Sequence, residues 1–447
     1  MVRNALSAKF LETVSEPVPV DPESELLKIF YKGALLTRPF FLEADEHQRL
    51  VGDLDVLHGA LTSLPDRLFG GDLTAFARAL DMNDDQISCV LRGRNTSVTR
   101  LSRADLYADA SGFRLLEYNM GSTIGGSDAV DISRGLLHHS GLKEFVEKHR
   151  LTHVDTLRSH IDTLRIESGA APGSRPVVAL TDWPSSYESL APYMQAVARR
   201  WNELGVEAHA CHIGELAARD GGVWLGERRV DIINRLFMLE DVLSGPGAMD
   251  LLDPVLDAAE RGEVKLFTPL DAELYGCKAA LAMLSDEANR HLFSARELAS
   301  LDRLLPWTRS VREGEVTLED GRRVDLVAYA LAYRDELALK PTLAHGGEGV
   351  VLGWQEGLTA EQWAARVRAA VDGPFVLQRR IRPVPELCAD RNGDLVEWTP
   401  VWGVFTTATV SGGAWIRATR TGSGADVINL GAGASMGAVF HAVADDR

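Results

Sequence analysis

The chain has 447 residues, of which 45% are hydrophobic and 25% are charged. These are ordinary values for a globular protein, and at ~100–200 residues per domain the length favours two to four domains. The formal net charge of −17 argues against nucleic-acid and anionic-membrane partners, because both require a basic surface.

Targeting signals and cysteine usage favour a cytoplasmic location. The four cysteines are scattered without C-x-x-C spacing, which disfavours a zinc finger and a disulfide framework. The first residues carry no apolar leader core, and no run approaches the roughly eighteen apolar residues of a membrane helix.

Residues 1–98 are predicted to be a helical N-terminal region. Apolar residues recur at three- and four-residue steps over 51–61 and 73–80, which is typical of helices. Residues 31–41 are interpreted as a packed connector. No chemistry is evident here, so the hypothesis for this region is an added substrate-contacting or dimerising layer, which leaves a homo-oligomer open.

Residues 99–170 carry a predicted metal-binding segment. Glu117 and Asn119 lie two residues apart on a predicted strand, so their side chains share one face. Asp105, expected on a neighbouring strand, completes an oxygen-only ligand set of the kind that Mg²⁺ prefers. Arg103 is placed to meet a phosphate. The alternative is an edge strand whose polar residues merely face water.

After these strands, residues 125–128 predict the start of a helix, because Ser127 and Asp128 are good N-caps. Such an N-terminus attracts anions, so Ser122, Thr123 and Ser127 are candidate contacts for a substrate carboxylate or acyl phosphate. Capping alone would explain at least one of them.

The histidines do not favour zinc. His149 and His153 would share one helix face, but Arg150 stands where a zinc protease motif needs glutamate. A solvated helix face is the favoured interpretation.

Residues 176–270 predict a small parallel α/β domain after a glycine- and proline-rich linker at 169–176. Strands are expected over 177–181, 206–212 and 231–237, with a helix over 187–204. Open sheets of this kind bind ligands at the carboxyl ends of their strands, so Glu188 and Arg235 are candidate substrate contacts. A surface ion pair is the alternative for both.

Residues 271–447 contain a second set of phosphate-binding features. An apolar strand ends in Lys340, a loop with Gly346, Gly347 and Gly349 follows, and a second strand leaves at Val350. Glycines let backbone N–H groups approach phosphate oxygens, and a lysine supplies charge. The pattern is neither a Walker A loop nor a dinucleotide fingerprint. A plain hairpin with a glycine turn is the alternative.

Two further strand predictions complete this region. Residues 374–381 form a strand in which Gln378, Arg379 and Ile381 could meet an adenine edge; the alternative is an edge strand guarded by arginines. Residues 399–410 and 414–417 predict a hairpin that turns at Ser411-Gly412-Gly413.

Taken in order, these segments resemble the circularly permuted ATP-grasp ligases of the glutathionylspermidine-synthase type. The resemblance implies that Asp105, Glu117 and Asn119 bind Mg²⁺ and that Arg103 contacts the γ-phosphate. Residues 275–286 resemble a family helix that opens with a phosphate-binding lysine, here Lys278.

The same resemblance assigns the C-terminal segments. Lys340 would be the second nucleotide lysine, and its glycine loop would cover the phosphates. Gln378 would lie on the strand that meets adenine. Arg417 and Asn429 would line the nucleotide or substrate site, and His345 in the glycine loop could touch a phosphate.

The chain departs from the family after Asn119, where Met-Gly-Ser-Thr-Ile-Gly-Gly-Ser replaces Ala-Asp-Thr-Pro. The departure leaves the metal set intact and the acceptor substrate open. No amidase half is expected.

The fold implied is α+β: a circularly permuted ATP-grasp with a small parallel preATP-grasp-like domain at 176–270 and a helical region at 1–98. The metal segment at 99–170 would serve the nucleotide-binding lobes at 271–447.

The function implied is ATP-dependent carboxylate–amine ligation through an acyl phosphate, with ATP and Mg²⁺ and with release of ADP and phosphate. Arg103 and Lys340 would be catalytic. The partners would be a small-molecule or peptide carboxylate and an amine. The alternatives are an ATP-dependent small-molecule kinase on the same scaffold and a nucleotide-binding protein without turnover.

Overall fold

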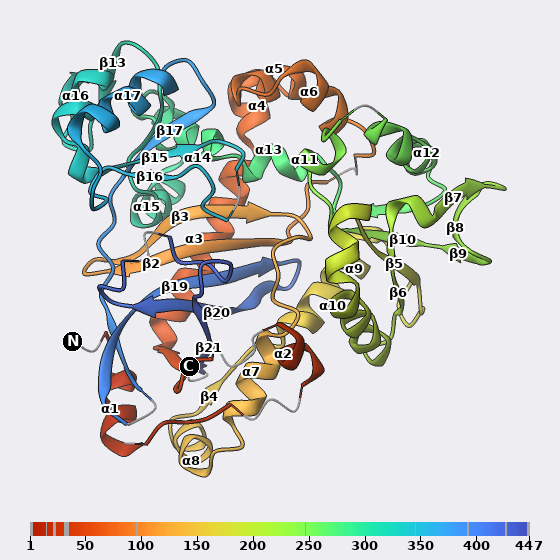
Figure 1. The fold of residues 1–447 in the computed structure, drawn as a ribbon, viewed down its shortest axis with the longest axis horizontal. Coiled ribbons are helices and arrows are strands. Elements are labelled where there is room, and N and C mark those ends of the chain that lie inside the picture. Colours follow the sequence, from red (N-terminus) through yellow and green to blue (C-terminus); the bar gives the residue numbers. More distant parts are fainter. Residues whose placement is uncertain are drawn as a thin grey trace.

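The computed structural model describes residues 3–14, 16–20, 24–30, 35–94, 97–245, 247–344, 346–390, 393–424 and 427–444. The chain is a mixed α/β structure built around three larger sheets (Figure 1). None of the helices in the described part of the chain has the length and apolar character needed to cross a membrane.

The central sheet combines strands from distant parts of the sequence. Its order is β1-β21-β20-β19-β2-β3, with β18 beside β19 and β4 beside β21, and only the β1–β21 pair is parallel. The strands are β1 Phe40–Leu42, β2 Ser102–Asp109, β3 Gly112–Met120, β4 Leu151–Thr152, β18 Glu386–Ala389, β19 Leu395–Thr407, β20 Val410–Arg420 and β21 Ser435–Ala442. The predicted metal segment thus joins the C-terminal strands in one sheet.

The N-terminal region is helical, as predicted. Its helices are α1 Ala5–Thr13, α2 Glu25–Phe30, α3 Ala44–Thr62, α4 Leu64–Phe69, α5 Leu73–Ala79 and α6 Asp84–Val90. Apolar residues of α3, among them Leu54 and Leu57, pack with Leu106 and Leu115 of the central sheet in one core. The connector prediction for 31–41 was incomplete: 31–34 lie outside the described residues, and Phe40 begins β1. Because Phe40–Leu42 pair with β21, they form a strand of the central sheet and not a connector.

A second sheet of four parallel strands lies within residues 177–267. Its order is β11-β10-β5-β6, and every pair is parallel. The strands are β5 Val177–Asp182, β6 Glu207–His212, β10 Ile232–Arg235 and β11 Lys265–Phe267, with the connecting helices α9 Thr156–Ser168, α10 Pro184–Glu203, α11 Leu239–Val242 and α12 Ala248–Glu260. The strands β7 Leu216–Arg219, β8 Gly222–Leu225 and β9 Arg228–Val230 form a separate small antiparallel sheet.

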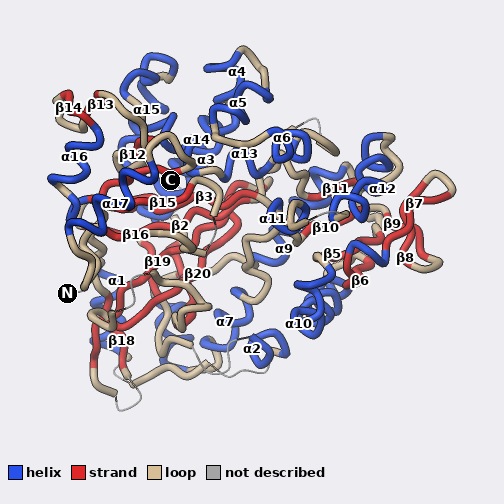
Figure 2. Tube along the Cα trace, turned by 45° about the horizontal axis from the view of Figure 1, so that its top comes forward, coloured by secondary structure: helices blue, strands red, loops and turns tan. Residues whose placement is uncertain are grey.

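The third sheet carries Lys340 and Gln378. Its order is β12-β17-β15-β16, antiparallel throughout, with β12 Thr308–Ser310, β15 Leu337–Pro341, β16 Val351–Leu352 and β17 Phe375–Arg379. Around it lie α13 Ala272–Gly276, α14 Lys278–Ser285, α15 Ala295–Leu304, α16 Leu326–Ala332, α17 Ala360–Ala370 and the hairpin of β13 Glu315–Thr317 and β14 Arg323–Asp325. Figures 1 and 2 show this sheet alongside β2 and β3.

The turn of the C-terminal hairpin differs from its prediction. Residues 408–409 make the turn, whereas Ser411, Gly412 and Gly413 lie inside β20. A Cβ atom on Gly412 would lie 2.6 Å from Thr407 Cγ2. The glycines therefore permit a close approach of neighbouring chains and do not mark the turn.

Two helix predictions between 125 and 153 also change. Helix α7 (Ala129–Leu136) begins where expected, with Asp128 at the N-cap, but Asp128 makes no capping hydrogen bond with its side chain. Helix α8 (Ser140–Lys148) ends at His149, and β4 lies between His149 and His153. The two histidines do not share a helix face, because the chain leaves the helix at Arg150, which has a positive φ of 50°.

Candidate active site

The three predicted metal ligands meet on one face of β2 and β3. The strand register pairs Asp105 with Glu117 and Arg103 with Asn119, so these four side chains share one face. Asn119 Nδ2 donates to Asp105 Oδ2 at 3.2 Å and to Glu117 Oε1 at 3.4 Å. The structure therefore brings the three residues together, with the Asn119 amide nitrogen turned toward both carboxylates. Their role as metal ligands stays a prediction.

Two arginines hold the Asp105 carboxylate. Arg103 donates from Nε and Nη2 to its two oxygens at 2.8 and 2.9 Å, and Arg417 Nη2 lies 2.7 Å from Oδ2. Asp105 is 2% exposed. Burial alone would raise the pKa of this carboxyl, but the charges of the two arginines outweigh burial and hold the pKa well below its usual range. Asp105 is thus ionised at neutral pH.

Both predicted lysines reach the same site. Lys278 opens α14, and its Nζ lies 3.4 Å from Glu117 Oε2 and donates to the Ala344 carbonyl at 2.8 Å. Lys340 Nζ donates to the Leu116 carbonyl at 3.0 Å and to Gln378 Oε1 at 2.6 Å. Burial, with a smaller effect of the nearby Lys278 charge, lowers the pKa of Lys340 to about 8.

These groups form the charged end of a cleft between the central and third sheets. The space between the two sheets amounts to about 800 Å³ when the solvent at its mouth is included. Apolar side chains line it beyond the lysines: Leu116, Ala338, Val350, Leu352, Trp354, Ile381, Val401 and Ile428. At the charged end, Lys278, Lys340 and Arg417 line the cleft together with Asp105 and Glu117, and Arg103 binds Asp105 from outside the lining. The cations outnumber the carboxylates, which suits a polyanion joined to an apolar ring system.

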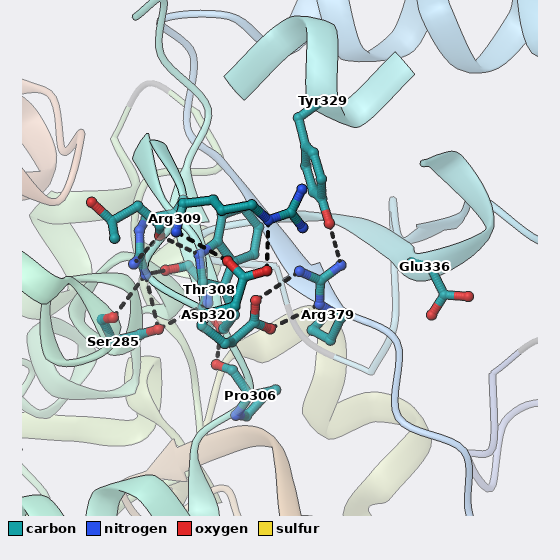
Figure 3. Close-up of polar contacts among 12 residues, drawn as sticks. Ser285, Pro306, Thr308, Arg309, Asp320, Tyr329, Glu336 and Arg379 are labelled. Atoms are coloured by element: carbon teal, nitrogen blue, oxygen red, sulfur yellow. Dashed lines mark hydrogen bonds and ion pairs between the residues drawn. The ribbon is translucent and has the colours of Figure 1, made fainter. Parts of the chain in front are cut away.

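The predicted adenine strand, β17, borders the cleft. The Gln378 side chain is already engaged, because it accepts from Lys340 and donates to Thr308 Oγ1 at 3.4 Å. The Arg379 guanidinium is also engaged, with both Glu319 carboxylate oxygens at 2.8 Å and the Tyr329 hydroxyl at 2.9 Å (Figure 3). A planar ring in the cleft could therefore contact the main chain of this segment and the Ile381 side chain.

The glycine loop is the hairpin between β15 and β16. Gly346, Gly347 and Gly349 all have positive φ, a backbone conformation that glycine adopts without a steric penalty. The carbonyl of Gly346 accepts from Asn429 Nδ2 at 2.5 Å, so a side chain from the C-terminal part of the chain contacts the loop over the cleft. His345 lies outside the described residues.

The predicted substrate residues are divided between two places. Arg417 belongs to the cleft, whereas Ser122, Thr123 and Ser127 line a second cavity together with His160, Asp182, Trp201 and Asn234. Glu188 is an exposed residue of α10 that lines neither the cleft nor this cavity.

Arg235 is buried on the other side of β10. Its Nε donates to the Thr268 carbonyl at 2.9 Å, and its Nη1 donates to the Phe237 carbonyl at 2.6 Å and lies 3.3 Å from Glu273 Oε1. Only Asn234, its neighbour in the strand, faces the second cavity. Sequence reasoning chose the wrong one of two adjacent residues, although strand alternation was the signal that separates them.

Several contacts and residues of these sites were not predicted from the sequence. The pairing of Arg417 with Asp105 depends on strands that are far apart along the chain. His160 and Trp201 lie in the helices α9 and α10, where their polar atoms carry no recognisable motif. A buried histidine or tryptophan in a helix is usually a packing residue. His160 and Trp201 differ from such residues in that they line a cavity.

Comparison with protein-family models and with curated proteins finds no match. Among solved structures, the chain is similar to a glutathione synthetase-like effector from Globodera pallida in its apo form, with 12% identity, a TM-score of 0.55 and coverage of 91% of this chain and 89% of that chain. A proposed gamma-glutamylcysteine synthetase from Methylobacillus flagellatus KT gives 12% identity, a TM-score of 0.43 and coverage of 86% and 88%; this weaker likeness adds no argument.

The first likeness shows the fold. The ATP-grasp assignment itself remains a prediction. The circular permutation and the nearer relation to glutathionylspermidine synthases remain predictions.

Proposed function

We propose that this chain is an ATP-dependent carboxylate–amine ligase that forms an amide bond and releases ADP and phosphate. The observation that carries the proposal is the charged end of the cleft, where Lys278, Lys340 and Arg417 surround the carboxylates of Asp105 and Glu117 below a glycine hairpin. The fold likeness to a glutathione synthetase-like protein supports the same reaction class.

The residues fit a nucleotide and its metal by their chemistry. Asp105, Glu117 and Asn119 would hold Mg²⁺, because hard cations take carboxylate and amide oxygens. Bound there, Mg²⁺ would neutralise charge on the ATP phosphates. The apolar part of the cleft suits the adenine ring, and the main chain after Gln378 borders it.

The cations of the site would stabilise charge that moves during transfer. A substrate carboxylate oxygen attacks the γ-phosphorus, and the bond from this phosphorus to the β-phosphate oxygen breaks, giving ADP and an acyl phosphate. Arg103, Lys278 and Lys340 supply fixed positive charge around the moving phosphoryl group, the main protein contribution to such transfers.

In the second step the amine nitrogen attacks the acyl carbon, and the carbon–oxygen bond to phosphate breaks. The ammonium gives up two protons, one to the leaving phosphate and one to solvent, and the product is the amide. Because an acyl phosphate reacts with water, the site must exclude solvent during its lifetime. The hairpin of Gly346–Gly349 would serve as the cover.

Product analysis tests the proposal. The protein is incubated with Mg-ATP and pooled carboxylates, with and without pooled amines. We expect ADP, phosphate and a new amide mass only when both pools are present. A phosphorylated carboxylate or alcohol formed without amine would favour the kinase, and AMP as product would contradict an acyl-phosphate route.

A further inference from the structure

A second cavity lies at the carboxyl ends of the parallel strands β5 and β10. It encloses about 810 Å³, counting the solvent at its mouth. The loop with Ser122, Thr123 and Ser127 forms one wall, and α10 forms the opposite wall with Leu190, Met194 and Val197. This cavity is separate from the nucleotide cleft, and the two share no lining residue.

The sheet topology marks this position as a ligand site. Helix α10 connects β5 to β6 on one side, whereas β10 is followed by α12 and by β11 on the other side. The crevice between β5 and β10 is therefore the point at which the connections diverge. Open α/β sheets bind ligands at such a point, outside the carboxyl ends of the strands.

Three buried polar atoms in the cavity have no hydrogen-bond partner among the described residues: His160 Nε2, Trp201 Nε1 and Asn234 Oδ1. The residues are 7%, 1% and 1% exposed. Asn234 lies near enough to oppose the lowering of the His160 pKa by burial, but no hydrogen bond of ordinary geometry joins the two. Buried polar groups are nearly always paired, so unpaired atoms around one cavity indicate a missing partner.

The cavity has the opposite charge character to the cleft. No lysine or arginine lines it, and Asp182 supplies a carboxylate. Burial raises the pKa of Asp182, and the Asp241 charge adds to this effect. Burial likewise raises the pKa of the Tyr193 hydroxyl, and the Asp128 charge adds to it. Three acidic side chains thus act on this region, which favours a cation and disfavours a free carboxylate.

The cavity adjoins the phosphate end of the cleft across a single loop. Gly125 lines the cavity, and a Cβ atom on Gly125 would lie 2.8 Å from Trp415 Cη2 on its other side. The Arg103 guanidinium carbon is 5.5 Å from the Trp415 ring, and Arg103 donates to the Ile124 carbonyl of the same loop. The loop that contains Ile124 and Gly125 therefore separates a ligand in the cavity from Arg103, the predicted phosphate contact.

From these observations we infer that the second cavity binds the amine substrate, and that this substrate is a primary amine on an apolar body with an uncharged oxygen. The ammonium group would lie between Asp182 and Asn234 Oδ1. Leu180, Leu190, Met194, Val197 and Leu236 would enclose the apolar body, and Trp201 Nε1 would donate to the oxygen. The inference rests on the proposed ligase function and names the class of its amine. The carboxylate substrate would bind on the other side of this loop, near Arg103, where cations predominate.

Calorimetric titration of the full chain at pH 7 tests this without turnover. The probes are leucinamide, which has all three features, 4-methylpentanamide, which lacks the amine, and 4-methylpentanoate, which has a carboxylate. We expect leucinamide to bind at least tenfold more tightly than either of the others. Stronger binding of 4-methylpentanoate, or no detectable binding of leucinamide at 10 mM, would overturn the inference.

Variants locate the binding. Asp182→Asn should weaken leucinamide binding at least tenfold and leave 4-methylpentanamide unchanged, and Trp201→Phe should weaken both amides severalfold. Glu188→Gln on the exposed face of α10 is the matched control and should change neither. Leucinamide affinity that is unchanged in a folded Asp182→Asn protein would place the amine elsewhere and overturn the inference.

The same variants separate this inference from the proposed function. ATP binding to Asp182→Asn should be normal, because Asp182 does not line the cleft. If leucinamide binds as expected but no pool of substrates yields ADP, the ligase proposal fails and the cavity assignment stands. If ADP and an amide form but leucinamide does not bind, the cavity assignment fails alone.

Discussion

At the residue scale, Asp105 connects the two halves of the site. Its carboxylate binds Arg103 on its own strand and Arg417 from β20, and its neighbours across the register are Glu117 and Asn119. Breaking a buried ion pair by neutralising one partner leaves the other charge uncompensated. Substitutions at Asp105 are therefore expected to affect both folding and catalysis. The Glu117 side chain is 19% exposed, so a substitution there should change catalysis with a smaller effect on folding.

Neutralising Glu117 should abolish turnover. Glu117→Gln keeps the shape of the side chain but removes one of the two carboxylates expected to hold Mg²⁺, so we expect a fall of about 100-fold or more in kcat, partly recovered at high Mg²⁺. Steady-state rates over a Mg²⁺ series measure this, with the melting temperature as a check on folding. Asp105→Asn should lose turnover and also stability. Near-normal rates in either variant would contradict the metal assignment.

The Lys340 ammonium should make ATP binding depend on pH. Burial lowers the pKa of Lys340 to about 8 in the free protein, and bound phosphates favour the charged form. As pH rises from 7 to 9, the free protein loses this charge, so the Kd for ATP should rise about tenfold. Titration calorimetry without other substrates measures the change.

The matched variant is Lys340→Arg, because arginine keeps its charge over this range. Its Kd for ATP should be nearly the same at pH 7 and pH 9, whatever the absolute affinity. A wild-type Kd that does not change between these pH values would show that Lys340 does not meet the phosphates.

At the element scale, the hairpin between β15 and β16 combines a fixed lysine with a loop whose backbone requires glycine. A Cβ atom on Gly347 would lie 2.3 Å from Val427 Cγ1, whereas one on Gly346 would meet nothing within 4 Å. Both residues have positive φ, 84° and 63° respectively. Alanine at Gly346 therefore adds backbone strain alone, whereas alanine at Gly347 also disturbs the packing of the loop against Val427.

The two alanine variants should differ in activity. Gly346→Ala carries only the cost of a left-handed alanine, about 1 kcal/mol, and should change kcat/KM for ATP only severalfold. Gly347→Ala also displaces the loop from Val427 and should lower kcat/KM by more than tenfold. Parallel kinetics of the two proteins test this, and equal effects would mean that the contact with Val427 has no role in positioning the loop.

At the scale of the whole molecule, buried ion pairs tie the N-terminal region to the C-terminal strands. Arg38 Nη2 lies 2.6 Å from Glu386 Oε2, and Arg3 Nε lies 3.3 Å from Glu386 Oε1. Arg38 is 2% exposed and Glu386 is fully buried. Together with the pairing of β1 and β21, these contacts attach Arg3, Arg38 and β1 to the central sheet.

Glu386→Gln should destabilise the whole protein by about 3–5 kcal/mol, because it leaves the buried Arg38 without a counter-charge. Arg3 keeps its ion pair with Glu46. Urea unfolding followed by circular dichroism measures the difference. The control is Glu336→Gln, which breaks the exposed pair with Arg382 and should cost less than about 1 kcal/mol. Equal stability losses in the two variants would contradict a structural role for the buried pair.

Short-range patterns in the sequence were enough to predict which neighbouring residues of the site lie on one face. Alternation along a strand was enough to place Glu117 and Asn119 on one face, and glycines after an apolar strand ending in Lys340 were enough to predict the hairpin. The parallel domain followed from strands and helices in alternation. These features depend on neighbours within about twenty residues, for which periodicity and turn chemistry are reliable guides.

Only the tertiary structure decided which distant groups meet. It brought Arg417 to Asp105, Asn429 to the glycine loop and β1 to β21, and it showed that Asn234 rather than Arg235 faces the second cavity. It also moved the C-terminal turn to residues 408–409. Contacts between distant segments arise from the packing of whole sheets and helices, which leaves no periodic pattern in the local sequence. For the same reason, the polar atoms of His160 and Trp201 became candidates for binding only when the structure showed the cavity around them.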